Sequence, residues 1–149
     1  MTNSPLTNDV AATTFESPHE LLGAVGQNLG TTGWLTLDRD ALAQFADATW
    51  SVAPAESDDV PPFMILSLTN LFMPQLLEVQ GTSSGVNYGT GTVRFGTTAR
   101  PGDKLRARAS ITGAAEVAGG VQTTVEITVE IDGASEPACV VESLSRWML

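Results

Sequence analysis

The sequence predicts an α+β domain in which one long apolar helix lies inside an antiparallel β-sheet. Residues 61–79 (PPFMILSLTNLFMPQLLEV) form the longest apolar run, and no charge falls between Asp59 and Glu78. Most of the chain after residue 85 alternates between apolar and polar residues, as half-buried strands do. A helix that is apolar on all sides must be covered by other elements. We therefore expect the strands to wrap the helix.

The N-terminal part begins with a polar, aperiodic stretch over residues 1–14, which indicates a loose tail ahead of a single domain spanning residues 15–149. A short helix is expected to open at Pro18. Ser17 is its predicted cap, and Glu20 would complete a capping box.

Further helices follow in the first half. A strand is expected over residues 33–37, then a helix from Arg39 to about Ala48 that is capped by Asp38. After a loop, the central apolar helix is expected to bend near Pro74, because proline lacks the N–H that continues a helix.

The second half is predicted to be sheet. Short strands are expected over residues 86–88 and 92–95, which glycines separate. Longer strands are expected over residues 104–111, 121–131 and 139–147. The alternation is cleanest over residues 121–131, where the odd-numbered residues are predicted to face the core.

The composition restricts the partners. A net charge of −10 and a pI near 4.2 disfavour nucleic acid and anionic membranes. Prolines and polar residues interrupt the apolar run, so it is interpreted as a buried helix rather than a membrane span. One cysteine and one histidine exclude an internal disulfide and a His/Cys metal cluster, and no cofactor is indicated. The start of the chain lacks the pattern of a signal peptide, so a cytoplasmic location is expected.

Several stretches occur in an order that characterises one protein family. They are GTTGWLTLDRDALAQFADAT (residues 30–49), LSLTNLFMPQLL (66–77), GVNYG (85–89), VRF (93–95), PGDKLRAR (101–108) and EPAC (136–139). In this order the chain resembles the MaoC-like (R)-specific enoyl-thioester hydratase/dehydratase branch of the hot-dog fold. The resemblance implies a long helix inside a curled antiparallel sheet, and a dimer with acyl-thioester pockets at its interface. It also implies reversible hydration of a 2-enoyl thioester as the parent reaction.

The catalytic motif of that family is missing. Its members follow Ala-Thr with Gly-Asp, four residues and then His, and the Asp/His pair activates water. Here Ala48 and Thr49 are followed by Trp50 at the Gly position, Ser51 at the Asp position and Glu56 at the His position.

The group that binds the thioester oxygen is missing as well. The family has His-Gly at the start of the central helix, and a backbone N–H there receives the developing charge. The matching positions are Pro61 and Pro62, which have no N–H to donate. Hydration by the usual mechanism is therefore not expected.

The sequence offers candidates for residues that take the place of the missing catalytic groups. Glu56, Asp58 and Asp59 form an acidic cluster near the expected pocket mouth and are candidate catalytic residues, Glu56 first. The alternative is a solvated loop that caps the next helix. Trp50 and Phe63 are candidates for lining an enlarged apolar pocket, and core packing explains them equally well.

Other candidates concern substrate binding. Asn87 and Tyr88 fall where the resembled family contacts its ligand, although hydrogen bonds within the sheet also explain them.

A basic strip is a candidate site for the phosphates of coenzyme A or for an acidic carrier protein, with cross-strand pairing to Glu126 and Glu130 as the simpler explanation. The strip consists of Arg94, Arg100, Lys104, Arg106 and Arg108. His19 is expected on the surface and Cys139 in the core.

Three functions remain open. The first is an enzyme that dehydrates, isomerises or cyclises a polyketide-type or acyl-thioester substrate, free or bound to coenzyme A or a carrier protein, without an Asp/His pair. The second is a non-catalytic subunit that forms a heterodimer with an intact hot-dog hydratase. The third is a residual hydratase that uses Glu56. The sequence does not choose between a homodimer and a heterodimer.

Overall fold

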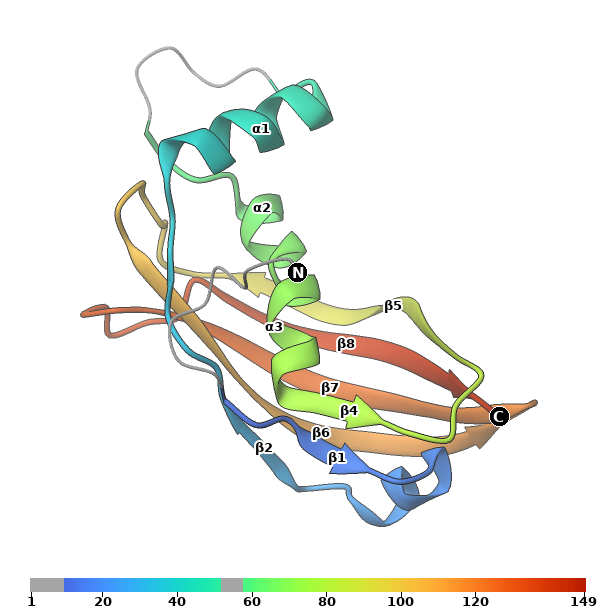
Figure 1. Ribbon diagram of the computed structural model, residues 1–149. Coiled ribbons are helices and arrows are strands. Elements are labelled where there is room, and N and C mark those ends of the chain that lie inside the picture. Colours follow the sequence, from blue (N-terminus) through green and yellow to red (C-terminus); the bar gives the residue numbers. More distant parts are fainter. Residues whose placement is uncertain (1–9, 52–57) are drawn as a thin grey trace.

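The computed structural model describes residues 10–51 and 58–149, and over these residues it confirms the α+β prediction (Figure 1). The helices are η1 (Pro18–Gly23, a 3-10 helix), α1 (Arg39–Thr49), α2 (Pro62–Ser67) and α3 (Thr69–Leu76). The strands are β1 (Thr13–Phe15), β2 (Asn28–Thr31), β3 (Leu35–Thr36), β4 (Leu77–Val79), β5 (Ser84–Phe95), β6 (Lys104–Val117), β7 (Gly120–Ile131) and β8 (Cys139–Met148).

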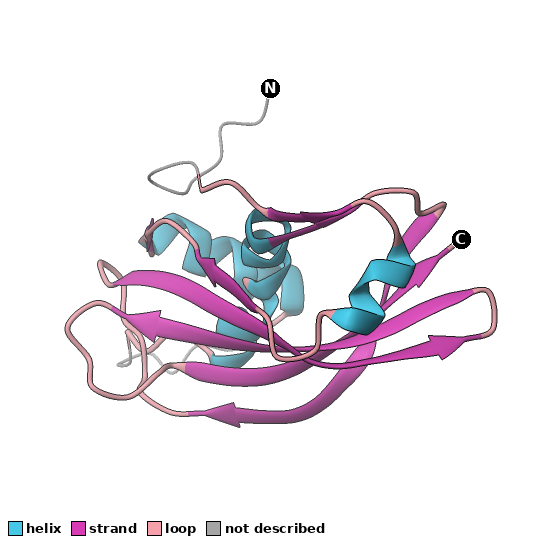
Figure 2. Ribbon diagram, turned by 90° about the horizontal axis from the view of Figure 1, so that it is seen from below, coloured by secondary structure: helices cyan, strands magenta, loops and turns pink. Residues whose placement is uncertain are grey.

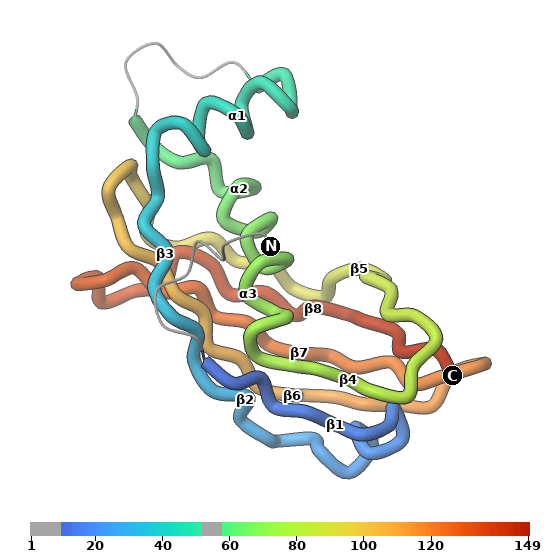
Figure 3. Tube along the Cα trace, viewed as in Figure 1, coloured from blue at the N-terminus to red at the C-terminus, as the bar shows by residue number. Residues whose placement is uncertain are grey.

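A six-stranded antiparallel sheet is the main body of the molecule. Its order is β2-β6-β7-β8-β5, and β3 also pairs with β6. The sheet curls around α2 and α3, which lie on one of its faces (Figure 2). The chain passes from β2 through β3 to α1, which lies beyond α2 on the β5 side of the molecule (Figures 1 and 3).

The core lies between the helices and the inner face of the sheet. On β7 the odd-numbered residues face the core as predicted, and Val125, Ile127 and Val129 have no exposed surface. Phe72 and Leu76 of α3 are fully buried against this face. Burial of this apolar surface supplies the main driving force for folding.

The predicted central helix is divided in two at Leu68, a division that the sequence did not predict. Leu68 separates α2 from α3, while Pro74 lies inside α3. Beside the break, the Thr69 hydroxyl donates to the Leu66 carbonyl at 2.7 Å. The Leu71 N–H donates to the Leu68 carbonyl, which is a tighter i to i−3 contact. Hydroxyl groups that compete for backbone carbonyls bend helices at such positions.

The N-terminal segment also differs from the prediction. Thr13 and Thr14, expected in the tail, belong to β1, which pairs in parallel with β4. The helix at Pro18 is a single 3-10 stretch, and Ser17 makes no side-chain cap. The Glu20 carboxylate instead accepts from the N–H of Glu16 at 2.8 Å, one residue before the expected cap, so the predicted capping box does not form.

β5 is one continuous edge strand rather than two pieces. Its pairing with β8 shifts register between Asn87 and Gly89 and again between Thr90 and Val93, so glycines mark bulges inside one strand. Almost the whole strand is exposed in the single chain. Phe63 of α2 is also exposed, so the chain leaves part of its apolar helix uncovered.

A search of the described residues for possible membrane spans finds no helix with the length and apolar character that a span needs. The apolar run is divided between α2 and α3, and both pack on the sheet.

Candidate functional site

A cavity of about 500 Å³ lies where α1, α2 and the end of β5 meet. Its walls are mainly apolar, with Leu42 and Ala46 from α1, Ile65 from α2 and Phe95 from β5. The polar side chains in the wall are Ser51, Asp59, Thr97 and Thr98. An apolar cavity with a few polar groups is the usual form of a small-molecule site.

Local sequence explains why α1 forms one wall. Asp38 caps the helix as predicted, because its carboxylate accepts from the N–H of Ala41 at 2.6 Å. Leu42, Phe45 and Ala46 then fall on one side of the helix at helical spacing. None of the eleven residues of α1 is fully buried, so the helix is held mainly by this one side.

Two consecutive prolines start α2 at the other wall. Pro61 precedes the helix and Pro62 is its first residue, and neither has an N–H. The Met64 N–H donates to the Pro61 carbonyl at 2.9 Å. The loop after β5 completes the wall, because the Val60 N–H donates to the Ala99 carbonyl at 2.9 Å.

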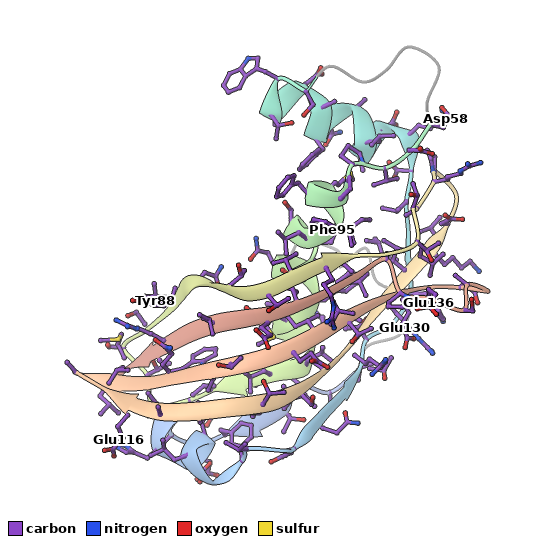
Figure 4. The ribbon with its side chains drawn as sticks, turned by 180° about the vertical axis from the view of Figure 1, so that it is seen from behind. Asp58, Tyr88, Phe95, Glu116, Glu130 and Glu136 are labelled. Carbon is purple, nitrogen blue, oxygen red and sulfur yellow. The ribbon has the colours of Figure 1, made fainter. Side chains whose placement is uncertain are left out.

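The acidic candidates occupy different positions. Glu56 lies outside the described residues. Asp58 lies near the start of α1 (Figure 4) and forms a bidentate ion pair with Arg39, with N–O distances of 2.9 and 3.0 Å. The hydrogen bond and charge of Arg39 lower the pKa of Asp58. A carboxylate with a lowered pKa is a weaker base, so this pairing disfavours Asp58 as the proton acceptor.

Asp59 is the acidic candidate that lines the cavity. Its carboxylate lies 3.6 Å from Nε of Arg100, on the loop that follows β5. Ser51 lies in the same wall, and its hydroxyl shares a 2.6 Å hydrogen bond with the Thr49 hydroxyl. The cavity therefore offers one described carboxylate together with hydroxyl donors.

The aromatic candidates lie outside this cavity. Trp50 follows the last residue of α1 with 90% of its surface exposed. Phe63 is 68% exposed and packs edge-on against Phe95, with ring centres 5.8 Å apart. Phe95 lines the cavity, so Phe63 touches the site through this ring. Neither Trp50 nor Phe63 lines this cavity within the single chain, and their role in an enlarged apolar pocket stays a prediction.

Asn87 and Tyr88 lie toward the opposite end of β5 from Phe95, as Figure 4 shows for Tyr88. The Asn87 amide donates to the Asn70 side chain at 3.2 Å, and both line a second cavity of about 370 Å³ beside α3. Tyr88 stacks with the Arg146 guanidinium at 3.6 Å. Within one chain, neither Asn87 nor Tyr88 lines the first cavity.

The basic strip lies mostly on the outer face of the sheet. Arg106 and Arg108 each donate through Nε to the Glu130 carboxylate, at 2.9 and 2.7 Å. Arg106 also lies over the Trp34 ring at 4.4 Å. Since Leu105 and Ala107 face the core, Arg106 and Arg108 point away from both helices and the cavity. Arg94 and Lys104 are exposed on β5 and at the start of β6.

Other reactive groups are remote. His19, the only histidine of the chain, is exposed in η1, which packs against β6 and β7 far from α1 (Figure 1). Cys139 is fully buried, and burial raises the pKa of its thiol. Within residues 10–51 and 58–149, no three His, Cys, Asp or Glu side chains lie close enough to share a metal ion.

Sequence reasoning missed part of the site. Thr97 and Thr98 line the cavity because the loop after β5 folds back to the start of α2, and their only sequence signal is that they follow a predicted strand. Arg100 of the predicted basic strip lies on the same loop, beside Asp59. The sequence predicts Arg39 as the start of a helix, and no pattern in it indicates the pairing of Arg39 with Asp58.

Comparison with known proteins identifies the family. No family model matches the chain. The chain is 35% identical over 148 residues to 3-hydroxyacyl-thioester dehydratase Z of Mycobacterium tuberculosis, and the match covers 91% of this chain and 98% of that protein. The chain belongs to the MaoC-like hydratase/dehydratase family of the hot-dog fold.

Solved structures of two other proteins have the same fold. The (R)-hydratase from A. caviae involved in PHA biosynthesis superposes with a TM-score of 0.66 at 18% identity, covering 83% of this chain and 96% of that one. The ChsH1–ChsH2 complex from Mycobacterium tuberculosis contains a chain that superposes with a TM-score of 0.63 at 14% identity, covering 84% of this MaoC-like chain and 98% of that one.

Proposed function

We propose that this chain binds an acyl or polyketide-type thioester in the 500 Å³ cavity and isomerises it by proton transfer, without activating water. The observation that carries the proposal is an apolar cavity whose described wall contains one carboxylate, Asp59, and no imidazole. Hydration needs one group to activate water and another group or a relay to place a proton on carbon. A double-bond shift needs only one group, which takes the proton and returns it.

The proposed step balances with Asp59 as that group. The carboxylate of Asp59 removes a proton from C2 of a 3-enoyl thioester, and the electron pair moves onto the thioester oxygen. The resulting carboxylic acid returns the proton to C4, which leaves the double bond between C2 and C3. The Ser51, Thr97 and Thr98 hydroxyls in the wall are donors for the thioester oxygen. Holding the substrate close supplies much of the acceleration.

Proton exchange with solvent tests this function. Purified protein is incubated in D₂O with a 3-enoyl and a 2-enoyl thioester, and NMR follows deuterium at C2 and C4. We expect deuterium at these carbons and interconversion of the two isomers. Asp59→Asn should lower the rate by at least about 100-fold, because general acid–base groups contribute about that much.

Asp58→Asn is the matched control, because Asp58 is paired with Arg39 outside the cavity lining. It should leave the exchange rate within about twofold of the wild-type rate. Accumulation of a 3-hydroxyacyl product would contradict the proposal and favour a hydratase that uses Glu56. An absence of exchange at high protein concentration would also contradict it.

A second candidate is a non-catalytic subunit of a heteromeric hydratase/dehydratase. The exposed β5 edge and the exposed Phe63 support it, because a partner sheet could cover both. The similarity to a chain of the ChsH1–ChsH2 complex supports it as well. In this case the chain alone would exchange no protons. Adding an intact hot-dog hydratase subunit would produce activity that Asp59→Asn does not change.

A further inference from the structure

A pocket of about 280 Å³ lies on the outer face of the sheet, on the side away from α2 and α3. We call it the outer pocket and define it by Trp34, Arg106, Arg108, Thr128, Glu130 and the turn over residues 131–137. Figure 4 shows Glu130 and Glu136 at the same end of the sheet. None of these residues lines the 500 Å³ cavity, so the outer pocket is a separate concave surface that the proposed reaction does not use.

Two arginines of the outer pocket share one carboxylate. The Nε groups of Arg106 and Arg108 donate to different oxygens of Glu130, at 2.9 and 2.7 Å. The two guanidinium groups therefore lie side by side, and two positive charges face one negative charge. A cluster with an excess of positive charge attracts an anion, even on a chain whose net charge is −10.

Both arginines are held in place while part of each guanidinium stays available. The Arg106 guanidinium lies over the Trp34 ring at 4.4 Å, and the side chains of Arg106 and Arg108 are 39 and 56% exposed. Each arginine uses Nε for Glu130, and no acceptor in the described part of the chain bonds to their Nη groups. The planar Nη groups of a fixed arginine match the oxygens of a phosphate.

Thr128 adds a third donor. It faces outward on β7, directly opposite Arg108 of β6, yet it is only 4% exposed. Thr128 lines the outer pocket, and its hydroxyl has no hydrogen-bond partner among residues 10–51 and 58–149. A polar side chain with so little exposure usually has such a partner. An oxyanion in the outer pocket would accept a hydrogen bond from this hydroxyl.

The turn beside the arginines indicates what else the ligand carries. Asp132, Ser135 and Glu136 are exposed in this part of the wall. Carboxylates accept hydrogen bonds and repel a second anionic group, so this wall disfavours a polyanion. Hydroxyl groups next to a single phosphate would instead donate to these carboxylates.

We propose that the outer pocket binds a small phosphate monoester that also carries hydroxyl groups. The phosphate lies between Arg106, Arg108 and the Thr128 hydroxyl, and the hydroxyl groups of the ligand face Asp132 and Glu136. The outer pocket and the 500 Å³ cavity share no residue, so this ligand is distinct from the thioester substrate. The inference does not depend on whether Asp59 transfers a proton.

Calorimetric titration of the full chain with glycerol 3-phosphate tests the proposal, with inorganic phosphate and glycerol as comparison probes. We expect a dissociation constant below about 1 mM for glycerol 3-phosphate, weaker binding of inorganic phosphate and no binding of glycerol. Arg108→Gln should raise the dissociation constant at least about tenfold, because it removes a charge-assisted hydrogen bond. Thr128→Val keeps the shape of the side chain and should raise it about threefold, because one hydroxyl donor is lost.

Arg94→Gln is the matched control. It removes the same charge from the outer face, where Arg94 lies opposite Val140, but Arg94 is outside the outer pocket. It should leave the dissociation constant within about twofold of the wild-type value. Equal losses in Arg94→Gln and Arg108→Gln would overturn the proposal, because they would indicate attraction to the face as a whole.

Two further outcomes would overturn the proposal. One is the absence of glycerol 3-phosphate binding up to about 10 mM. The other concerns coenzyme A, which we expect to bind to the outer pocket no more tightly than glycerol 3-phosphate. Coenzyme A that displaces glycerol 3-phosphate with an affinity at least about tenfold higher would assign the outer pocket to the thioester substrate.

Discussion

At the scale of single residues, position in the fold separates the acidic groups. Asp58 is held by Arg39, and Glu130 is held by Arg106 and Arg108, so each carboxylate has a guanidinium within 3 Å. Asp59 lines the cavity, with its carboxylate 3.6 Å from Nε of Arg100. Its position in the cavity wall is the reason that we propose proton transfer by Asp59.

The Glu130 cluster predicts a pH effect on stability. Burial is the largest single influence on the pKa of Glu130 and raises it, but Arg108 and Arg106 together outweigh burial, so the pKa lies below its ordinary value of 4.5. A carboxyl group whose pKa falls on folding stabilises the protein above the pKa of the unfolded chain. That contribution is lost as pH falls through the folded pKa.

Glu130→Gln should therefore lower the free energy of unfolding by about 1 kcal/mol at pH 7, since the pairs are partly exposed. Urea titrations from pH 7 down to about pH 3 should show the difference from wild type shrinking as the pH falls. Glu116→Gln is the control, because Glu116 is exposed near the end of β6 (Figure 4) and should leave stability unchanged. A difference that grows as the pH falls would contradict the assignment.

At the scale of elements, the central helix has two environments. α3 is held by Phe72 and Leu76, which are fully buried against the sheet. α2 buries Met64 and Ile65 but leaves Phe63 exposed next to Phe95 of the cavity wall. α3 therefore contributes to the core, while α2 borders the site.

Two phenylalanine substitutions separate these roles. Phe72→Ala should lower the free energy of unfolding by about 3–5 kcal/mol, because it removes a fully buried ring and leaves a cavity. Phe63→Ala should change stability by less than about 1 kcal/mol, since its ring is mostly in water. Urea denaturation at low protein concentration measures both. Equal losses would show that α2 packs as tightly as α3.

At the scale of the whole molecule, the acidic charge predicts how salt affects the association of two copies. Two copies with a net charge of −10 repel each other at long range, and salt screens this repulsion. Pairing along the exposed strand β5 would have little charge to be screened, because Arg94 is the one charged residue of that strand.

An association of two copies through β5 should therefore become several-fold tighter as the salt concentration rises from about 0.01 to about 0.5 M. Sedimentation at constant pH measures the change. Dissociation at high salt would contradict this expectation, because it would indicate subunits held together by ion pairs.

The sequence by itself determined the features that depend on local pattern. The alternation of residues over β7 was sufficient to predict the strand, and the Asp38 cap was sufficient to predict the start of α1, because near neighbours in the chain set both features. The order of the segments was sufficient to predict the family. The absence of an Asp/His pair also follows from the sequence, which contains one histidine, and that residue lies in η1.

Only the tertiary structure decided which residues meet. Asp58 pairs with Arg39 nineteen positions earlier, and the loop after β5 folds against Val60 at the entrance of α2. The left-handed backbone of Trp50 and the division of the central helix at Leu68 are likewise features that the sequence did not predict. Contacts between distant segments depend on how the sheet curls, and no local pattern in the chain records that geometry.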